Sequence, residues 1–179
     1  MLAPLGLSEL ESGYATLPPA PSDQGRLRLI VKRKTDGSRD LPQSAELSLV
    51  EGLVGDRWFA KANRDPNAQI TVMRRDVAEL IANGRPLSLF GDNLFVDLDI
   101  SADNLPIGSQ LKIGACLLEV TPEPHTGCSL FKSRFGADAL RFTAQKSFRT
   151  HRLRGVHFRV LAAGTIRCDD EIVVVTRGY

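Results

Sequence analysis

The chain has 179 residues, which is enough for one domain with a core of its own. Its hydrophobic share of 42% and charged share of 25% are ordinary for a globular protein. It contains no apolar run of membrane-helix length, no signal-peptide pattern at its N-terminus, and only three cysteines, too few for a disulfide framework. A reducing cytoplasm is therefore the predicted setting, and a net charge of +2 does not by itself indicate a nucleic-acid partner.

The first 24 residues are rich in proline, glycine, serine and alanine, most clearly at 18–22 (PPAPS). Such a composition is typical of a segment without regular structure. We therefore expect residues 1–24 to form an extended N-terminal arm or lead-in, and residues 25–179 to form the single folded domain.

Alternating and β-branched apolar runs then predict a series of short strands. These strands cover residues 26–33, 69–73, 93–100, 111–121 (bent or broken at Gly114), 156–162 and 171–176, with a short extended piece at 46–54. Turns are predicted at 34–38, which contains an Asp-Gly pair, and at 164–170, which contains Cys168. Helical spacing predicts helices over 74–83 and 135–144. Short strands outnumber helices, which favours a β-barrel or β-sandwich with a few helices around it.

Two of these strands carry predictions about the core. Over 93–100 the apolar alternation puts Leu94 on one side and Phe95 on the other with the aspartates, as in a half-buried strand. Cys116 shares a face with Leu118, so we expect its thiol to be packed in the core.

The stretch HTGCSLFKSRFG, from His125 to Gly136, is the clearest candidate for chemistry. A helix or tight turn beginning near Gly127 would favour the thiolate form of Cys128, and the positive charges of Lys132 and Arg134 would add to this effect. A thiolate can bind a soft metal or carry sulfur. A structural cysteine in a loop, beside a hydrogen-bonded His125, fits the same spacing.

Two further uses of Cys128 stay open. A His-x-x-Cys pair supplies at most half of a tetrahedral zinc site, and His151, His157 and Cys168 show no paired spacing that would complete it. A cysteine hydrolase needs a base and an orienting group, and nothing in the sequence selects among the three histidines.

The segment from Arg141 to Arg154 contains five Lys and Arg residues and no acid. It fits either a solvated basic face or an anion site for phosphate or a phosphorylated cofactor. Arg57 and Trp58 could line a pocket, the first by binding an anion and the second by stacking, and a core position for Trp58 is equally compatible. No phosphate-loop signature is present.

Six segments, taken in chain order, resemble the motifs of one family. They are GLVGDRW at 52–58, QITVM at 69–73, FGDNL at 90–94, LPIGSQLKIG at 105–114, PEPHTGC at 122–128 and RGVHFRVLAAGTIRCDD at 154–170. Each motif is short, but their order is that of the MOSC domain, the C-terminal domain of molybdenum cofactor sulfurases. The resemblance runs from about residue 26 to 176.

The resemblance implies a mainly β fold, a MOSC-like β-barrel with a few short peripheral helices, that binds the molybdenum cofactor (molybdopterin). Some members are proposed to carry sulfur received from a pyridoxal-phosphate-dependent desulfurase, and others hold molybdenum through the family cysteine and reduce N-hydroxylated compounds. Cys128 then becomes the sulfur carrier or molybdenum ligand, and the three-residue spacing favours His125 as a pocket residue that supports its thiolate. The residues expected to bind the cofactor are Arg57, Asn93, Lys132, Arg134 and Arg154. We identify no pyridoxal phosphate site in the sequence.

The chain departs from the family pattern at two motif positions. Asp92 stands where the family usually has glutamate, a side chain one methylene longer, and Asp169 stands where it usually has glycine, so we expect that turn to differ slightly.

The chain also reads as a lone small domain, without a fused desulfurase or an iron–sulfur segment, for which three cysteines are too few. The sulfur or electron donor is therefore expected to be another protein, a cysteine desulfurase or an electron-transfer partner, and neither a membrane nor a nucleic acid is expected as a partner.

An alternative from another class is a non-catalytic β-barrel domain that recognises an anionic partner. Its binding surface would be the basic segment from Arg141 to Arg154. Metal content in the purified protein separates this alternative from cofactor binding.

Overall fold

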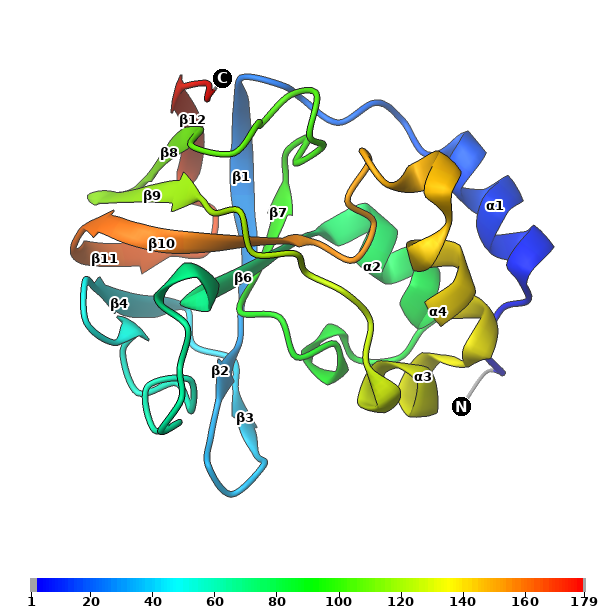
Figure 1. The fold of residues 1–179 in the computed structure, drawn as a ribbon, viewed down its shortest axis with the longest axis horizontal. Coiled ribbons are helices and arrows are strands. Elements are labelled where there is room, and N and C mark those ends of the chain that lie inside the picture. Colours follow the sequence, from blue (N-terminus) through cyan, green and yellow to red (C-terminus); the bar gives the residue numbers. More distant parts are fainter. Residues whose placement is uncertain (1–2, 179) are drawn as a thin grey trace.

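The computed structural model describes residues 3–178, and within them seven strands close into a β-barrel (Figure 1). Around the barrel the order is β1, β12, β8, β9, β10, β6 and β7, and β7 pairs with β1 to close it. Neighbouring strands are antiparallel except β6 and β7, which are parallel and connected through a helix. The strands are β1 Gln24–Ile30, β6 Ile70–Arg74, β7 Leu94–Asp97, β8 Gln110–Ile113, β9 Cys116–Val120, β10 Val156–Ala162 and β12 Glu171–Thr176. The mainly β barrel expected from the sequence is confirmed.

Two small sheets extend from the barrel. One contains β11 Gly164–Arg167, β4 Ser44–Ser48 and β5 Gly52–Leu53, and the other is the hairpin of β2 Lys32–Arg33 and β3 Arg39–Asp40. The interpretation of 164–170 as one turn is therefore wrong in its first half, because Gly164–Arg167 pairs with β4. Cys168 does lie in the turn that follows. In that turn Asp169 has a φ of +68°, the left-handed region that favours glycine, and its carboxylate pairs with Arg28.

The four α-helices gather on one side of the barrel (Figure 1). Four α-helices and three short 3₁₀ helices lie within the described residues: α1 Leu7–Thr16, α2 Arg75–Ala82, α3 Ser129–Phe135, α4 Ala137–Ala144, η1 Pro66–Ala68, η2 Leu87–Leu89 and η3 Lys146–Phe148. The predicted end of α2 is confirmed, since Asn83 adopts a φ of +45° and its N–H bonds to the carbonyl of Glu79. None of the described helices is long and apolar enough to cross a membrane.

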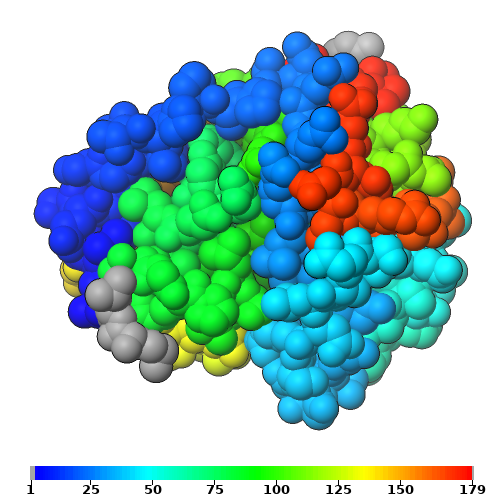
Figure 2. Space-filling view, turned by 180° about the vertical axis from the view of Figure 1, so that it is seen from behind, coloured from blue at the N-terminus to red at the C-terminus, as the bar shows by residue number. Residues whose placement is uncertain are grey.

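The expectation of an extended arm over 1–24 is wrong for Leu7–Thr16, which form α1. Leu10 on this helix is fully buried, and Gly13 packs so closely on Leu80 of α2 that a Cβ would collide with it. Figure 2 shows this N-terminal segment in blue, lying against the green chain. Composition suggested an unstructured arm, but burial of one apolar stripe against α2 and α4 stabilises the helix.

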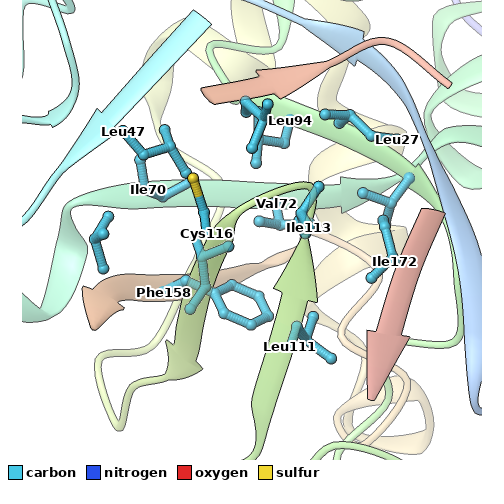
Figure 3. Close-up of a cluster of buried hydrophobic side chains, with 14 of the residues drawn as sticks. Leu27, Leu47, Ile70, Val72, Leu94, Leu111, Ile113, Cys116, Phe158 and Ile172 are labelled. Atoms are coloured by element: carbon cyan, nitrogen blue, oxygen red, sulfur yellow. The ribbon is translucent and has the colours of Figure 1, made fainter. Parts of the chain in front are cut away.

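Two hydrophobic clusters build the interior. The first fills the barrel, where side chains from different strands, among them Leu27, Val72 and Ile172, point toward one another (Figure 3). Cys116 belongs to this cluster with no exposed surface, which confirms its predicted core position. The second cluster lies between the barrel and the helices and contains most of the buried phenylalanines.

Strand β7 belongs to both clusters. Leu94 faces the barrel interior, and Phe95 on the opposite face is fully buried among the helices. The prediction of a half-buried strand with Phe95 on its wet side is therefore wrong. The helical layer covers the outer face of β7, so both faces of the strand need apolar side chains.

The buried stripe of α1 yields a stability prediction. We expect Leu10→Ala to lower the free energy of unfolding by about 2–5 kcal/mol, because it leaves a cavity between α1 and the second cluster. Ser12→Ala, on the exposed side of the same helix, should change it by less than about 0.5 kcal/mol. Urea unfolding monitored by circular dichroism measures both, and an equally small effect of both variants would contradict the docking of α1.

Candidate functional site

The chain from β9 to α3 crosses from the barrel to the helical side (Figure 1). It is an extended loop that ends at Cys128, the N-cap residue of α3, and the Cys128 side chain is exposed and not in a disulfide. Gly127 precedes it, and a Cβ there would collide with Leu140 and press on Phe131. The glycine therefore lets the loop lie close against α3 and α4 just before the thiol.

His125 points the other way, into the protein. Its side chain is only 11% exposed, and its Nδ1 lies 3.5 Å from Oδ1 of the fully buried Asp92. Its ring stacks at a tilt on that of His157, 4.5 Å between centroids. Gly155 makes room for it, because a Cβ at that position would lie 3.0 Å from Nδ1 of His125 and would collide with the carbonyl of Val72.

A buried ion pair lies behind this histidine. Nη1 of Arg154 is 2.5 Å from Oδ2 of Asp92, and the two side chains are 7% and 0% exposed. The same guanidinium donates to the carbonyl of Phe90 and lies 5.0 Å above the ring of Phe131. Arg154 thereby connects the start of β10 to the loop before β7 and to α3.

Burial and nearby charges favour the neutral form of both histidines. Burial, together with the nearby charge of Arg154, holds the pKa of His125 well below its usual value, and burial also lowers the pKa of His157. Within the described residues, Oδ1 of Asp92, Nδ1 of His125 and Nε of Arg154 are buried without a hydrogen-bond partner. The pocket therefore holds several polar atoms whose hydrogen-bonding capacity is unused.

A second buried polar group lies next to the first. Asp56 receives two guanidinium nitrogens of Arg33, at 2.7 and 2.9 Å, and the amide of Asn93. Burial alone would raise the pKa of Asp56, but the hydrogen bonds and charge of Arg33 lower it below its usual value. Asn93 also accepts from Thr71, so its side-chain amide is fully engaged within the protein. Trp58 is buried as well, which agrees with the core position that the sequence left open for it.

A cavity of about 480 Å³ opens beside the loop. His125 and Arg154 line it, together with Lys146, Arg149 and Arg152 of the basic segment. Loop residues 122–126 and Phe148 also line it. The basic segment is therefore not simply a solvated face, since part of it lines this open pocket.

The predicted site residues thus fall into separate groups. His125 and Arg154 meet at Asp92, whereas Arg57 and Arg134 lie beside Arg33 and the β2–β3 hairpin, away from the cavity lining. Lys132 is exposed on α3, and Cys128 is not among the residues that line the cavity. Their roles toward a cofactor remain predictions.

Sequence reasoning did not include Asp92, His157 or the Arg33–Asp56 pair among the site residues. Asp92 and Asp56 stood in the family motifs FGDNL and GLVGDRW, which was the available signal. The zinc alternative finds no support, because no group of three metal-ligating side chains occurs within residues 3–178.

The buried ion pair predicts a large cost for losing one partner. We expect Arg154→Met to lower the free energy of unfolding by about 3–5 kcal/mol, because Asp92 stays buried without a cation. The matched control is Arg159→Met, whose pair with Glu119 is 47% exposed on the arginine side and should contribute less than about 1 kcal/mol. Denaturant unfolding compares them, and similar losses would contradict a special role for the Arg154 pair.

The neutral state of His125 predicts a pH dependence. A histidine whose folded pKa lies below its unfolded pKa binds fewer protons when folded, so stability is complete above about pH 6.5 and falls at lower pH. Between pH 7.5 and 5.5 we expect His125 to contribute a loss of about 1.4 kcal/mol, and His125→Gln should lack that loss. Lys146→Gln, which changes no group that titrates in this range, is the control. The idea is refuted if the unfolding profiles of wild type and His125→Gln run parallel.

Comparison with known proteins places the chain in a family. The family model of the MOSC domain matches residues 61–173. No curated protein matches the sequence significantly. Three solved bacterial structures share the fold. YUAD from Bacillus subtilis has 16% identity, a TM-score of 0.64 and covers 83% of this chain and 94% of its own.

YiiM from Escherichia coli has 20% identity and a TM-score of 0.59, and the match covers 86% of this chain and 71% of YiiM. YiiM from Geobacillus stearothermophilus has 18% identity and a TM-score of 0.57, with 86% and 76% covered. At these identities the likeness concerns the fold, and the family model covers more than half of the chain. The chain belongs to the MOSC domain family.

Proposed function

We propose that this MOSC-domain protein binds a molybdenum-pterin cofactor and that the thiolate of Cys128 is the molybdenum ligand. The observation that carries the proposal is the exposed, unpaired Cys128 at the end of a loop whose His125 lies against the buried Asp92–Arg154 pair. A thiolate is a ligand of the softness that such a metal accepts. A free thiol also fits the predicted cytoplasmic setting, where cysteines stay reduced.

The charge of the residues near α3 also fits the cofactor. The cofactor is anionic, and the face that carries α3 has guanidinium groups without carboxylate partners within the described residues, those of Arg57 and Arg134. When bound, the cofactor would supply two-electron redox chemistry at its metal, which suits the reduction of N-hydroxylated compounds. The electrons would come from a separate partner protein.

The chain's own residues would set the position of the thiol. His125 lies against the Asp92–Arg154 pair, and the close packing of Gly127 restricts the chain one residue before Cys128. The lowered pKa of His125 favours its uncharged form near neutral pH, so the arginines and lysines supply the positive charge near the loop. These residues position the loop, and Cys128 is the group that touches the metal in this proposal.

The cavity supports a second candidate, a domain that binds an anionic partner without a metal. Lys146, Arg149 and Arg152 line it, which is the observation in favour of this candidate. Sulfur carriage on Cys128, with a cysteine desulfurase as donor, is the remaining use of the same thiol. Cofactor binding predicts molybdenum in the purified protein, sulfur carriage predicts a persulfide on Cys128, and anion binding alone predicts neither.

Metal analysis tests the proposal. In protein from a host that makes the cofactor, we expect molybdenum and, after oxidative release, pterin fluorescence. Cys128→Ala should lower the molybdenum content at least about tenfold, because it removes the metal-ligating thiolate. Cys168→Ala is the matched control, since Cys168 lies in the β11–β12 turn and should not affect the metal.

Two outcomes would contradict the proposal. Undiminished molybdenum in Cys128→Ala would exclude Cys128 as the ligand. Wild-type protein without molybdenum and pterin would exclude the cofactor, and a persulfide on Cys128 in that protein would then favour sulfur carriage.

A further inference from the structure

The cavity beside the loop that follows β9 is lined mainly by two segments of the chain. One is the loop itself, residues 121–126, and the other runs from the end of α4 to the start of β10 (Figure 1). Its volume of about 480 Å³ lies in the range of small-molecule sites, which measure roughly 300–1,000 Å³. A small inorganic ion would leave most of this space unfilled, so the size of the cavity favours an organic ligand.

Helix α1 holds the wall that follows α4 from its outer side. Nε2 of Gln145 donates to Oε1 of Glu11 at 2.6 Å, and the hydroxyl of Tyr14 lies 2.9 Å from Nδ1 of His151. The ring of Tyr14 also contacts that of Phe148 edge to face, with 5.4 Å between the centroids. Because Phe148 packs between α1 and the cavity, its ring is a fixed part of the cavity wall.

The residues around the cavity carry more positive than negative charge. Of the four cations that line it, only Arg154 has a carboxylate partner within residues 3–178. The other three are Lys146, Arg149 and Arg152, and the one carboxylate among the lining residues is that of the exposed Glu123. Lys146 and Arg149 are exposed, so water and salt screen their charges. The half-buried Arg152 is therefore the cation that most lacks a counter-ion.

Backbone contacts orient the side chain of Arg152. Its Nη1 donates to the carbonyl of Ile100 at 3.3 Å and to that of Leu105 at 2.6 Å, and these are its side-chain hydrogen bonds within the described residues. Burial lowers the pKa of this guanidinium, and no carboxylate charge offsets the effect. The residue also has a φ of +51°, in the left-handed region, and such conformations cluster at functional sites. Arg152 is thus an oriented cation whose other nitrogens are available to a ligand.

Much of the remaining lining is apolar. Ile107, Pro122, Pro124, Phe148 and Val156 all contribute to it. An apolar group placed against these side chains would be removed from water, which stabilises binding roughly in proportion to the apolar area buried. A fully hydrated anion such as inorganic phosphate would gain nothing from them. The lining therefore suits a ligand that has both an apolar part and a charge.

We propose that this cavity binds small organic carboxylates, with the carboxylate on the guanidinium of Arg152 and an apolar body against Phe148 and Ile107. A planar guanidinium matches the two oxygens of a carboxylate. A single negative charge suits a site with one half-buried cation and the carboxylate of Glu123 at its edge, because a dianion costs more to remove from water. The exposed Lys146 would attract the anion toward the opening.

The site is separate from Cys128, which does not line the cavity, so the inference does not depend on molybdenum. It rests on the second candidate function, whose cavity it uses, and it narrows the anionic partner to one class of small molecule. The molybdenum content of Cys128→Ala and the binding of a carboxylate are measured separately, so failure of one leaves the other standing.

The test is calorimetry on the full-length protein with three probes: naphthoate, its uncharged amide naphthamide, and inorganic phosphate. We expect naphthoate to bind saturably and at least about tenfold more tightly than either other probe, because only naphthoate has both the charge and the apolar body. Arg152→Gln should weaken naphthoate binding at least about tenfold, whereas Arg152→Lys keeps the charge and should retain part of the affinity. Arg159→Gln, on β10 but outside the cavity lining, is the control and should bind as the wild type does.

Thermal unfolding without a probe shows whether the variants fold. Should Arg152→Gln not fold, the exposed double variant Lys146→Gln/Arg149→Gln decides, and we expect it to weaken naphthoate binding about threefold or more. The inference is overturned if the wild type does not bind naphthoate saturably, if naphthamide binds equally well, or if the deciding variant binds undiminished. Tighter binding of phosphate than of naphthoate would also overturn it and would favour a phosphorylated partner.

Discussion

The buried pair of Asp92 and Arg154 is the interaction on which the arrangement of the site depends. The two residues are 62 positions apart in the chain, and their contact joins the loop before β7 to the start of β10. A buried charge is costly when unpaired, so this contact restricts how these two segments can lie. His125 packs against the pair and brings the loop from β9 with it. The pair therefore lies behind the loop that ends at Cys128, and it does not touch the thiol.

The site lies where two cores meet. The barrel cluster and the helical cluster share β7, and the polar residues that follow η2 lie at this boundary. A boundary between two packed layers leaves room for buried polar groups and for a cavity, whereas the barrel interior is filled by aliphatic side chains (Figure 3). The rigid barrel therefore holds the strand ends, and the loops between barrel and helices carry the thiol and the basic groups.

The cationic groups divide into two kinds. Arg33 and Arg154 are buried and paired with Asp56 and Asp92, and they belong to the framework. Arg39, Arg57 and Arg134 have no such partner within the described residues, and they lie on the framework that Arg33 builds. The shorter side chain of Asp92, in place of the family's usual glutamate, still reaches Arg154 directly. The neutralised arginines help to hold the local structure together, and the unpaired ones add positive charge beside the hairpin.

The sequence by itself determined the local structure and the family. Periodicity and turn residues were sufficient for most strands, for the end of α2 at Asn83 and for the core position of Cys116, because these depend on neighbours within a few residues. Only the tertiary structure decided that Leu10 docks the helix of the N-terminal segment, that β7 is buried on both faces with Phe95 on the helical side, and that Gly164–Arg167 pair with β4. It also decided which arginines are neutralised by a carboxylate and which are not within the described residues. Those outcomes depend on contacts between residues far apart in the chain, and no local pattern records which distant side chain will lie across from a charge or an apolar face.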